Sequence, residues 1–248
     1  PLSKMGSLEF MDILLNKISL REGFGDVLAD GITKASGLVG QGTETFITDY
    51  LSKGEQATAY DPRYFITTGL LCAMEPRMPI QQLHEISRLF IGWFQWAGKS
   101  GRPYLSTDVC RAVAKRFWGT ELAFDLSTYE GKALTAVNIQ HREYVKECLI
   151  LCDWAWPILT VEFSEDHIGD PSLESKIFSA AVGQEIDEAG LNRIGERVVN
   201  LQRAIVAREA RGSDTIADFH FTMPQKNDLL NPSGIAPGKD GEITDRKG

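Results

Sequence analysis

Hydrophobic residues recur along this chain at intervals of three and four, the spacing that places them on one side of an α-helix. We predict helices over residues 7–21, 27–36, 43–51, 79–96, 107–118, 172–182 and 187–209, besides a longer one in the middle of the chain. The apolar stripe of the last helix comprises Leu191, Ile194, Val198, Leu201 and Ile205. An alternating strand pattern is absent except for a few residues near Phe219. The pattern therefore predicts an all-α fold.

The longest predicted helix lies between Ser127 and Pro157. Ser127 and Glu130 have the S-x-x-E spacing of a capping box, and no proline follows until Pro157, so about six or seven turns are possible. One face of this helix would carry Ala133, Val137, His141, Tyr144, Val145, Cys148, Leu151 and Cys152. It would end in a turn made of Asp153, two tryptophans and a proline. We expect any chemical site of this chain to lie there.

Four side chains in or near this region are candidates for chemistry, and each also has a structural explanation. Cys148 and Cys152 are one helical turn apart and can face one site, but free cysteines are also common in cores. Two cysteines cannot complete a four-ligand metal site, and Cys152 at the helix end is the better ligand candidate. His141 is interpreted as a core histidine. His84 begins a helix after a loop, where either an acid–base or a structural role is possible.

Composition limits the possible classes of function. The 248 residues are 43% hydrophobic and 24% charged, as in ordinary globular proteins, and the net charge of −8 argues against nucleic acid or an anionic membrane as a partner. No apolar run is long enough to span a membrane, and four cysteines do not form a disulfide framework, so we expect a cytoplasmic protein. P-loop, dinucleotide, H-E-x-x-H and G-x-S-x-G motifs are absent. The first residue is proline, and we expect a piece of a longer protein.

An ordered series of short segments resembles the tungsten-containing aldehyde ferredoxin oxidoreductase family. The segment from Leu20 to Gly31 is similar to the family's R-E-G-x-G-D-x-L-A-x-G motif. The other segments, in chain order, are Lys53-Gly54, Tyr60-Asp61-Pro62-Arg63, Gly69-Leu70, Pro76-Arg77 with His84, Glu130-Gly131-Lys132-Ala133, Leu151-Cys152, Ile194 to Leu201, Arg203-Ala204, Arg208-Glu209 and Pro237 to Gly241. Each is short, and their common order over residues 10–248 carries the resemblance.

The resemblance implies the multihelical C-terminal domains of such a protein. Residues 1–75 would form the helical part of the middle domain. Residues 76–211 would form the C-terminal helical domain, which carries the cluster cysteine. Residues 212–248 would be an irregular extension, because prolines and glycines, Pro237 among them, dominate there.

The same resemblance implies cofactors and site residues. Proteins of the family bind tungsten, or sometimes molybdenum, between two pterin dithiolenes, with a [4Fe–4S] cluster alongside. Cys152 would be the fourth cluster ligand, with Leu151 and Glu147 near a pterin. The family commonly has Asp-x-x-Gly-Leu-Cys here, whereas this chain has Glu147, Ile150, Leu151 and Cys152. His84 matches a histidine near the tungsten that can exchange a proton with substrate.

The implied reaction interconverts aldehydes and carboxylic acids, and passes electrons to ferredoxin or an electron-transfer subunit. One alternative is the catalytic subunit of an ATP-independent benzoyl-CoA reductase, which acts on an aromatic acyl-CoA. A second alternative is a non-catalytic helical scaffold with a solitary buried Cys152. The family's pterin-binding region and its C-x-x-C-x-x-x-C motif are not in these residues. We therefore expect an upstream region of the same protein as a partner, an oligomer, and no activity from this chain alone.

Overall fold

The computed structural model describes most of the helical part of the chain. The described residues are 4–45, 51–52, 55–56, 60, 62, 65–126, 128–209, 214–217, 220, 235–237 and 243–245. The chain divides into two compact units, residues 1–57 and 58–248, which are described separately. The domain boundaries predicted after residues 75 and 211 stay predictions.

In the described residues of the first unit the helices with assigned bounds are α1 (Leu8–Ser19), α2 (Phe24–Ala29) and α3 (Ile32–Val39). A two-residue antiparallel ladder pairs β1 (Leu51–Ser52) with β2 (Glu55–Gln56). The helix predicted over residues 27–36 is wrong, because Gly31 has a φ of +88° and separates α2 from α3. The helix predicted over residues 43–51 lies mostly outside the described residues. α1 and α2 pack so closely that a Cβ on Gly25 would be 2.3 Å from the Lys17 carbonyl group.

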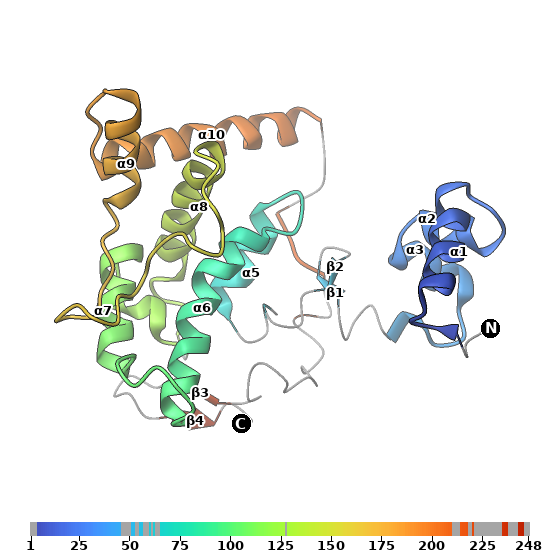
Figure 1. Cartoon of the computed structure of the whole chain (residues 1–248), viewed down its shortest axis with the longest axis horizontal. Helices are drawn as coiled ribbons and strands as arrows, with labels where there is room; N and C mark the ends of the chain where they lie inside the picture. Colours follow the sequence, from blue (N-terminus) through green and yellow to red (C-terminus); the bar gives the residue numbers. More distant parts are fainter. Residues whose placement is uncertain are drawn as a thin grey trace. The chain divides into compact units, whose positions relative to one another are not determined.

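The second unit is built from helices (Figure 1). They are α5 (Ile66–Met74), α6 (Ile80–Ala97), α7 (Thr107–Trp118), the 3₁₀ helix η3 (Glu121–Phe124), α8 (Lys132–Cys148), α9 (Leu173–Val182) and α10 (Glu188–Arg208). A short ladder pairs β3 (Ile235–Pro237) with β4 (Ile243–Asp245), so Pro237 lies in a strand although the sequence predicted irregular chain. Both strands of such a pair are edge strands, which tolerate proline. The all-α prediction is confirmed.

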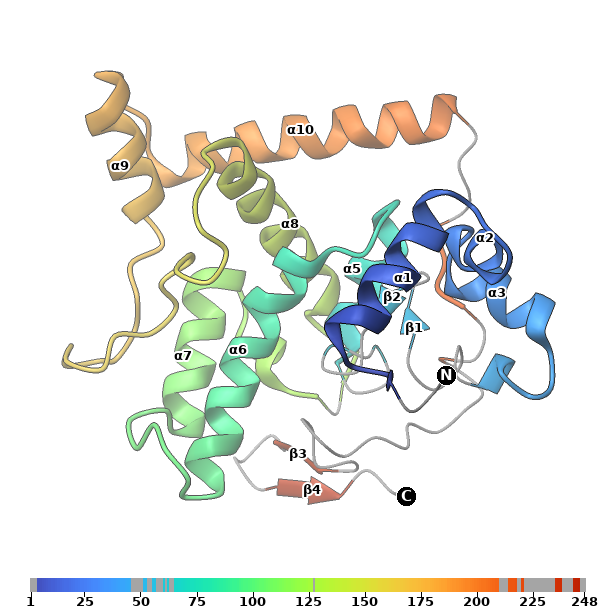
Figure 2. The same ribbon diagram turned by 45° about the vertical axis from the view of Figure 1, so that its right-hand side comes forward.

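The hydrophobic core of this unit lies where α6 meets α5, α7 and η3, and α6 and α7 run side by side in Figures 1 and 2. The rings of Phe90 and Phe124 stack with centroids 4.6 Å apart, and Phe65 lies 5.1 Å from Phe90 on the other side. The buried indole of Trp93 donates a hydrogen bond of 2.9 Å to the Thr107 hydroxyl, which joins α6 to α7. Within the described part of the chain, none of the helices combines the length and apolar composition needed to span a bilayer.

The central helix α8 is shorter than the sequence predicts. It starts after Gly131, which has a φ of +75°, and Ser127 lies outside the described residues. It ends at Cys148 because the chain reverses at Ile150, whose φ is +56°. The predicted apolar face is only partly correct: Tyr144 and Val145 are buried, but Val137 and Cys148 are exposed. The buried positions are largely polar or charged: Lys132, Thr135, Ala136, Ile139, Gln140, Arg142, Glu143, Tyr144, Val145 and Lys146.

The long helix α10 crosses α8 (Figure 1). Its buried positions are Leu191, Gly195 and Val199, spaced by four residues. The predicted stripe is therefore only partly correct, because Leu201 and Ile205 are 62% and 46% exposed. The two backbones approach closely at Gly195, on the buried side of α10, and Leu201 and Ile205 lie off that side.

Candidate functional site

The structure brings His84 against the segment that follows Cys152. His84 lies in the second turn of α6 and is buried, and its Nδ1 is hydrogen-bonded to the carboxylate of Asp153. The imidazole is flanked by two aromatic rings, with centroid distances of 5.0 Å to Trp154 and 5.2 Å to Tyr60. Two segments that the sequence singled out separately thus form one site.

Asp153 also binds a buried lysine through its second oxygen. Lys146 Nζ donates a hydrogen bond of 2.8 Å to Asp153 Oδ1 and another of 3.2 Å to the carbonyl oxygen of Trp156. Burial alone would raise the pKa of Asp153, but the hydrogen bonds from Lys146 and His84 outweigh it and lower this pKa. Asp153 is therefore a carboxylate that accepts from two side chains at once.

Two buried carboxyl groups lie beneath this pair. Glu143 and Glu85 are 1% and 0% exposed, and burial together with the charge of Glu85 raises the pKa of Glu143 well above its usual value. Lys146 Nζ lies 2.5 Å from Glu143 Oε2, and Arg142 Nε lies 3.6 Å from Glu85 Oε1. Lys146 also pairs with Asp153, so its ammonium group lies between the carboxyl groups of Glu143 and Asp153.

Arg88 fixes the loop that carries Asp153. It lies one turn after His84 on α6, and its guanidinium donates to three main-chain oxygens of the loop, those of Trp154 (2.9 Å), Trp156 (3.1 Å) and Pro157 (3.3 Å). The helix that positions His84 therefore also positions the chain after Cys152.

Both candidate cysteines of this region are exposed and free, unlike Cys72 and Cys110, which are buried. Core packing therefore does not account for Cys148 or Cys152, and the buried Cys152 of the scaffold alternative is wrong. The carbonyl oxygen of Cys152 accepts from the amides of Ala155 (3.1 Å) and Trp156 (2.9 Å), which turns the chain directly after the thiol.

A complete metal site is not present in the described part of the chain. No group of three or more histidine, cysteine, aspartate or glutamate side chains converges among those residues. An exposed thiol at a tight turn, as at Cys152, fits the role of a single ligand to a group whose other ligands come from elsewhere. The described residues could therefore supply one cluster ligand, Cys152, but not a complete metal site.

The remaining predicted residues lie around the end of α8. Glu147, in the last turn, forms an ion pair with Arg77, whose Nη2 is 3.3 Å from Glu147 Oε1. Leu151 is half-buried, and its amide donates to the Lys146 carbonyl oxygen at 3.0 Å. His141 is half-buried at the crossing with α10, where burial lowers its pKa despite the charge of Glu196.

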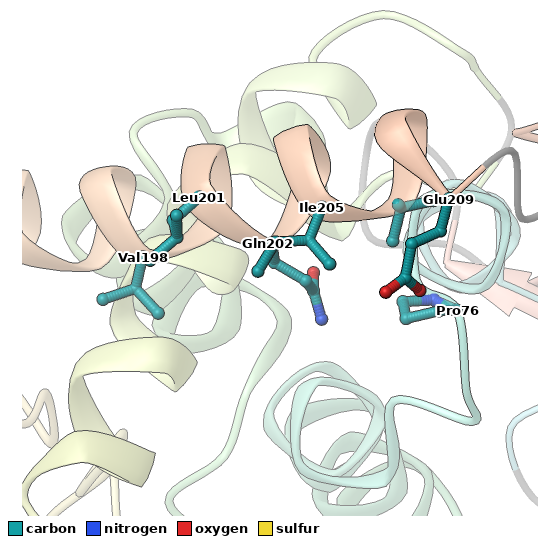
Figure 3. A pocket seen from close by; sticks show the side chains of 7 residues that line it. Pro76, Val198, Leu201, Gln202, Ile205 and Glu209 are labelled. Carbon is teal, nitrogen blue, oxygen red and sulfur yellow. The ribbon is translucent and has the colours of Figure 1, made fainter.

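An open apolar pocket of about 360 Å³ lies along α10, and Figure 3 shows most of its lining on one side of that helix. It is lined by Pro76, Val198, Leu201, Gln202, Ile205, Val206 and Glu209. None of the candidate site residues lines it. The pocket therefore has no part in the site at His84.

Sequence reasoning missed the partners of His84. Asp153 was recognised only as part of a turn, and Lys146 and Glu143 were not considered. The sequence does contain one indication of the pair: Glu143 and Lys146 have i, i+3 spacing, on the side of α8 opposite the expected apolar face. This spacing points to a buried pair only if that side of the helix is known to be buried.

The resemblance noted above is confirmed by comparison with known families. A family model described as aldehyde ferredoxin oxidoreductase, domains 2 and 3, matches residues 2–238, nearly the whole chain. No solved structure matches the chain. By the extent of this match, the chain belongs to the aldehyde ferredoxin oxidoreductase family and corresponds to domains 2 and 3 of its members.

Proposed function

We propose that this chain is the C-terminal part of a tungsten-dependent oxidoreductase that interconverts aldehydes and carboxylic acids and passes electrons to ferredoxin. Membership of the oxidoreductase family supports the reaction class. The observation that carries the site assignment is the contact between His84 and Asp153, the residue directly after Cys152. This contact supports the assignment, because the proposed acid–base group contacts the residue that follows the proposed cluster ligand.

Cys152 would supply one thiolate to a [4Fe–4S] cluster, and the other ligands would come from an upstream region of the protein. Glu147 and Leu151 would lie beside a pterin, and Arg77 would bring a positive charge to the same place through its ion pair with Glu147. When bound, these groups would supply two-electron chemistry at the metal and single-electron transfer at the cluster.

His84 would exchange a proton with the substrate. Oxidation of an aldehyde with water to a carboxylate releases protons together with the electron pair, so the reaction needs a base near the substrate. His84 is a suitable group because a ring nitrogen of imidazole can either accept or donate a proton. In the reverse direction the same nitrogen would return the proton.

The ligand assignment is tested on the full-length protein purified without oxygen. Cys152→Ser should abolish the visible absorption of the cluster, whereas the matched control Cys148→Ser should keep it. In the loaded wild-type protein an alkylating reagent should modify Cys148 and spare Cys152. An unchanged spectrum in Cys152→Ser, or equal alkylation of both thiols, would refute the assignment.

The metal and the role of His84 require two further measurements. Elemental analysis should find tungsten and about four irons per chain, the content of one [4Fe–4S] cluster. Iron and tungsten both absent, with the upstream region present, would instead support the scaffold alternative. His84→Asn should lower turnover while the metal content stays the same; loss of both would indicate a structural role.

A second candidate reaction, reduction of an aromatic acyl-CoA, is supported by the aromatic surroundings of His84. Trp154 is 73% exposed while its ring lies against the imidazole, so it offers a flat apolar surface to a planar substrate. Assays of one preparation with simple aldehydes and with an aromatic acyl-CoA separate the two reactions. Turnover of the aldehydes alone would exclude the second candidate.

A further inference from the structure

We propose that Asp153 is a positioning residue that selects the tautomer of His84. Asp153 accepts a hydrogen bond from the Nδ1–H group of His84, so Nε2 is the only ring nitrogen that can take up a proton. Lys146 orients the carboxylate of Asp153 so that it can only accept this hydrogen bond. The use of Nε2 in proton exchange rests on the proposed function, whereas the tautomer itself does not.

The tautomer follows from which groups can donate. The ammonium group of Lys146 can only donate, so Asp153 Oδ1 must be the acceptor in their 2.8 Å hydrogen bond. An ionised carboxylate has no proton to give through Oδ2 either. The proton between Asp153 Oδ2 and His84 therefore sits on Nδ1. A neutral imidazole in water prefers to carry its proton on Nε2, so the site selects the less common form.

The surroundings restrict other arrangements of these side chains. The side chains of Lys146, His84 and Asp153 are 2%, 11% and 20% exposed, so water has little access to the hydrogen bonds between them. The rings of Tyr60 and Trp154 flank the imidazole and oppose its rotation.

Further contacts hold the two partners of Asp153 in place. Arg88 fixes the main chain after Asp153, and Glu143 holds Lys146 from its other side. Both oxygens of the Asp153 carboxylate are hydrogen-bonded and its backbone is fixed. His84 therefore has one favourable state, in which Nδ1 donates to Asp153.

The tautomer is measurable without turnover. In full-length protein labelled with ¹⁵N-histidine, long-range ¹H–¹⁵N correlations distinguish a protonated from an unprotonated ring nitrogen. The His84 signals are assigned by their loss in His84→Gln. In the neutral imidazole we expect a proton on Nδ1 and none on Nε2. A proton on Nε2 in the wild-type protein would overturn the proposal.

Asp153→Asn provides the sharper test. Lys146 still requires an acceptor, so the oxygen of the introduced amide stays toward Lys146 and its NH2 group turns toward His84. Nδ1 must then accept, and the proton moves to Nε2. The matched control Asp166→Asn, at an exposed aspartate in another loop, should leave the His84 signals unchanged. An unchanged tautomer in folded Asp153→Asn would refute the role of Asp153.

A second substitution tests the role of Lys146. In Asp153→Asn with Lys146→Met, the amide is free to rotate, and its oxygen can again accept from Nδ1. The wild-type tautomer should return in this double variant. Persistence of the Nε2 proton there would refute the orienting role of Lys146. If neither variant folds, the wild-type measurement alone still decides the tautomer.

Activity separates this proposal from the proposed function. A wrong histidine tautomer costs about 10⁴-fold in serine proteases, and we expect a loss of at least about 10²-fold in loaded Asp153→Asn, with the cluster spectrum retained. Wild-type protein with the Nδ1 proton but no aldehyde turnover would refute the proposed function and leave the tautomer standing. Full turnover in Asp153→Asn with an inverted tautomer would refute the positioning role only.

Discussion

A Cβ on Gly195 would lie 2.0 Å from the main-chain oxygen of His141, so α10 and α8 cross in direct backbone contact. Gly195→Ala must push the two helices apart, and we expect it to lower the free energy of unfolding by about 3 kcal/mol. Urea unfolding checks this value. Gly37→Ala is the control, because a Cβ at Gly37 in α3 meets open space and alanine favours helix. Equal stability of Gly195→Ala and wild type would mean that the helices separate easily.

Glu75 connects three helices of the second unit through its carboxylate. It accepts hydrogen bonds from Gln82 (2.7 Å), Gln140 (3.3 Å), Tyr144 (2.9 Å) and Gln202 (3.2 Å). Glu75→Gln would turn an NH2 group toward these donors, so we expect a loss of about 2–3 kcal/mol in stability. Burial and the charge of Glu75 raise the pKa of Tyr144, so the substitution should also shift the phenol's titration downward. Ultraviolet absorbance against pH measures that shift; an unchanged titration would contradict the contact.

Glu143 should make stability depend on pH above the ordinary pKa of glutamate. Its pKa is raised in the folded protein, so the folded state keeps a proton that the unfolded chain releases above about pH 4.3. Stability therefore falls as pH rises from there toward the folded-state pKa, by up to about 1.4 kcal/mol per pH unit. Glu143→Gln should flatten the curve of unfolding free energy as the pH rises above about 4.3. Glu165→Gln, at an exposed site, serves as the control, and parallel curves for Glu143→Gln and wild type would contradict the prediction.

The four cysteines should fall into two classes of reactivity. Burial raises the pKa of Cys110 to about 12, and Cys72 is fully buried, so both should resist a maleimide in the folded protein. Cys148 and Cys152 are exposed and should react in protein free of the cluster. Mass spectrometry of labelled peptides gives the result, with the urea-unfolded chain as the reference in which all four react. Rapid labelling of Cys110 would mean that the packing around α7 opens readily.

Much of the helical fold could be predicted from periodicity. The helix predicted over residues 107–118 matches α7, and those over 79–96 and 187–209 match α6 and α10 within one residue. These helices bury apolar residues on one side, which is the signal that periodicity detects. The central helix was misplaced because α8 buries paired charges instead. Its end depends on the φ of Ile150, which residue type does not reveal.

Single residues of the candidate site could be predicted from the sequence, but the contacts between them could not. The resemblance pointed to His84 and Cys152, yet the hydrogen bond from His84 to Asp153 joins residues 69 apart in the chain. Such a contact depends on how α6 and the end of α8 pack, and a single sequence carries no local signal for it. Lys146 was overlooked for the same reason, because its burial is favourable only when Glu143 and Asp153 surround it.

The hydrogen bonds from Arg88 to the loop after Cys152 limit how this site could be grafted onto another protein. A designer who grafted residues 149–157 alone onto another helical scaffold would lose the guanidinium that holds three of the loop's carbonyl oxygens. The portable unit is the loop together with the first half of α6 and the last turn of α8, which carry Arg88, His84 and Lys146. Chimeras between related proteins should therefore exchange the loop, the first half of α6 and the last turn of α8 together.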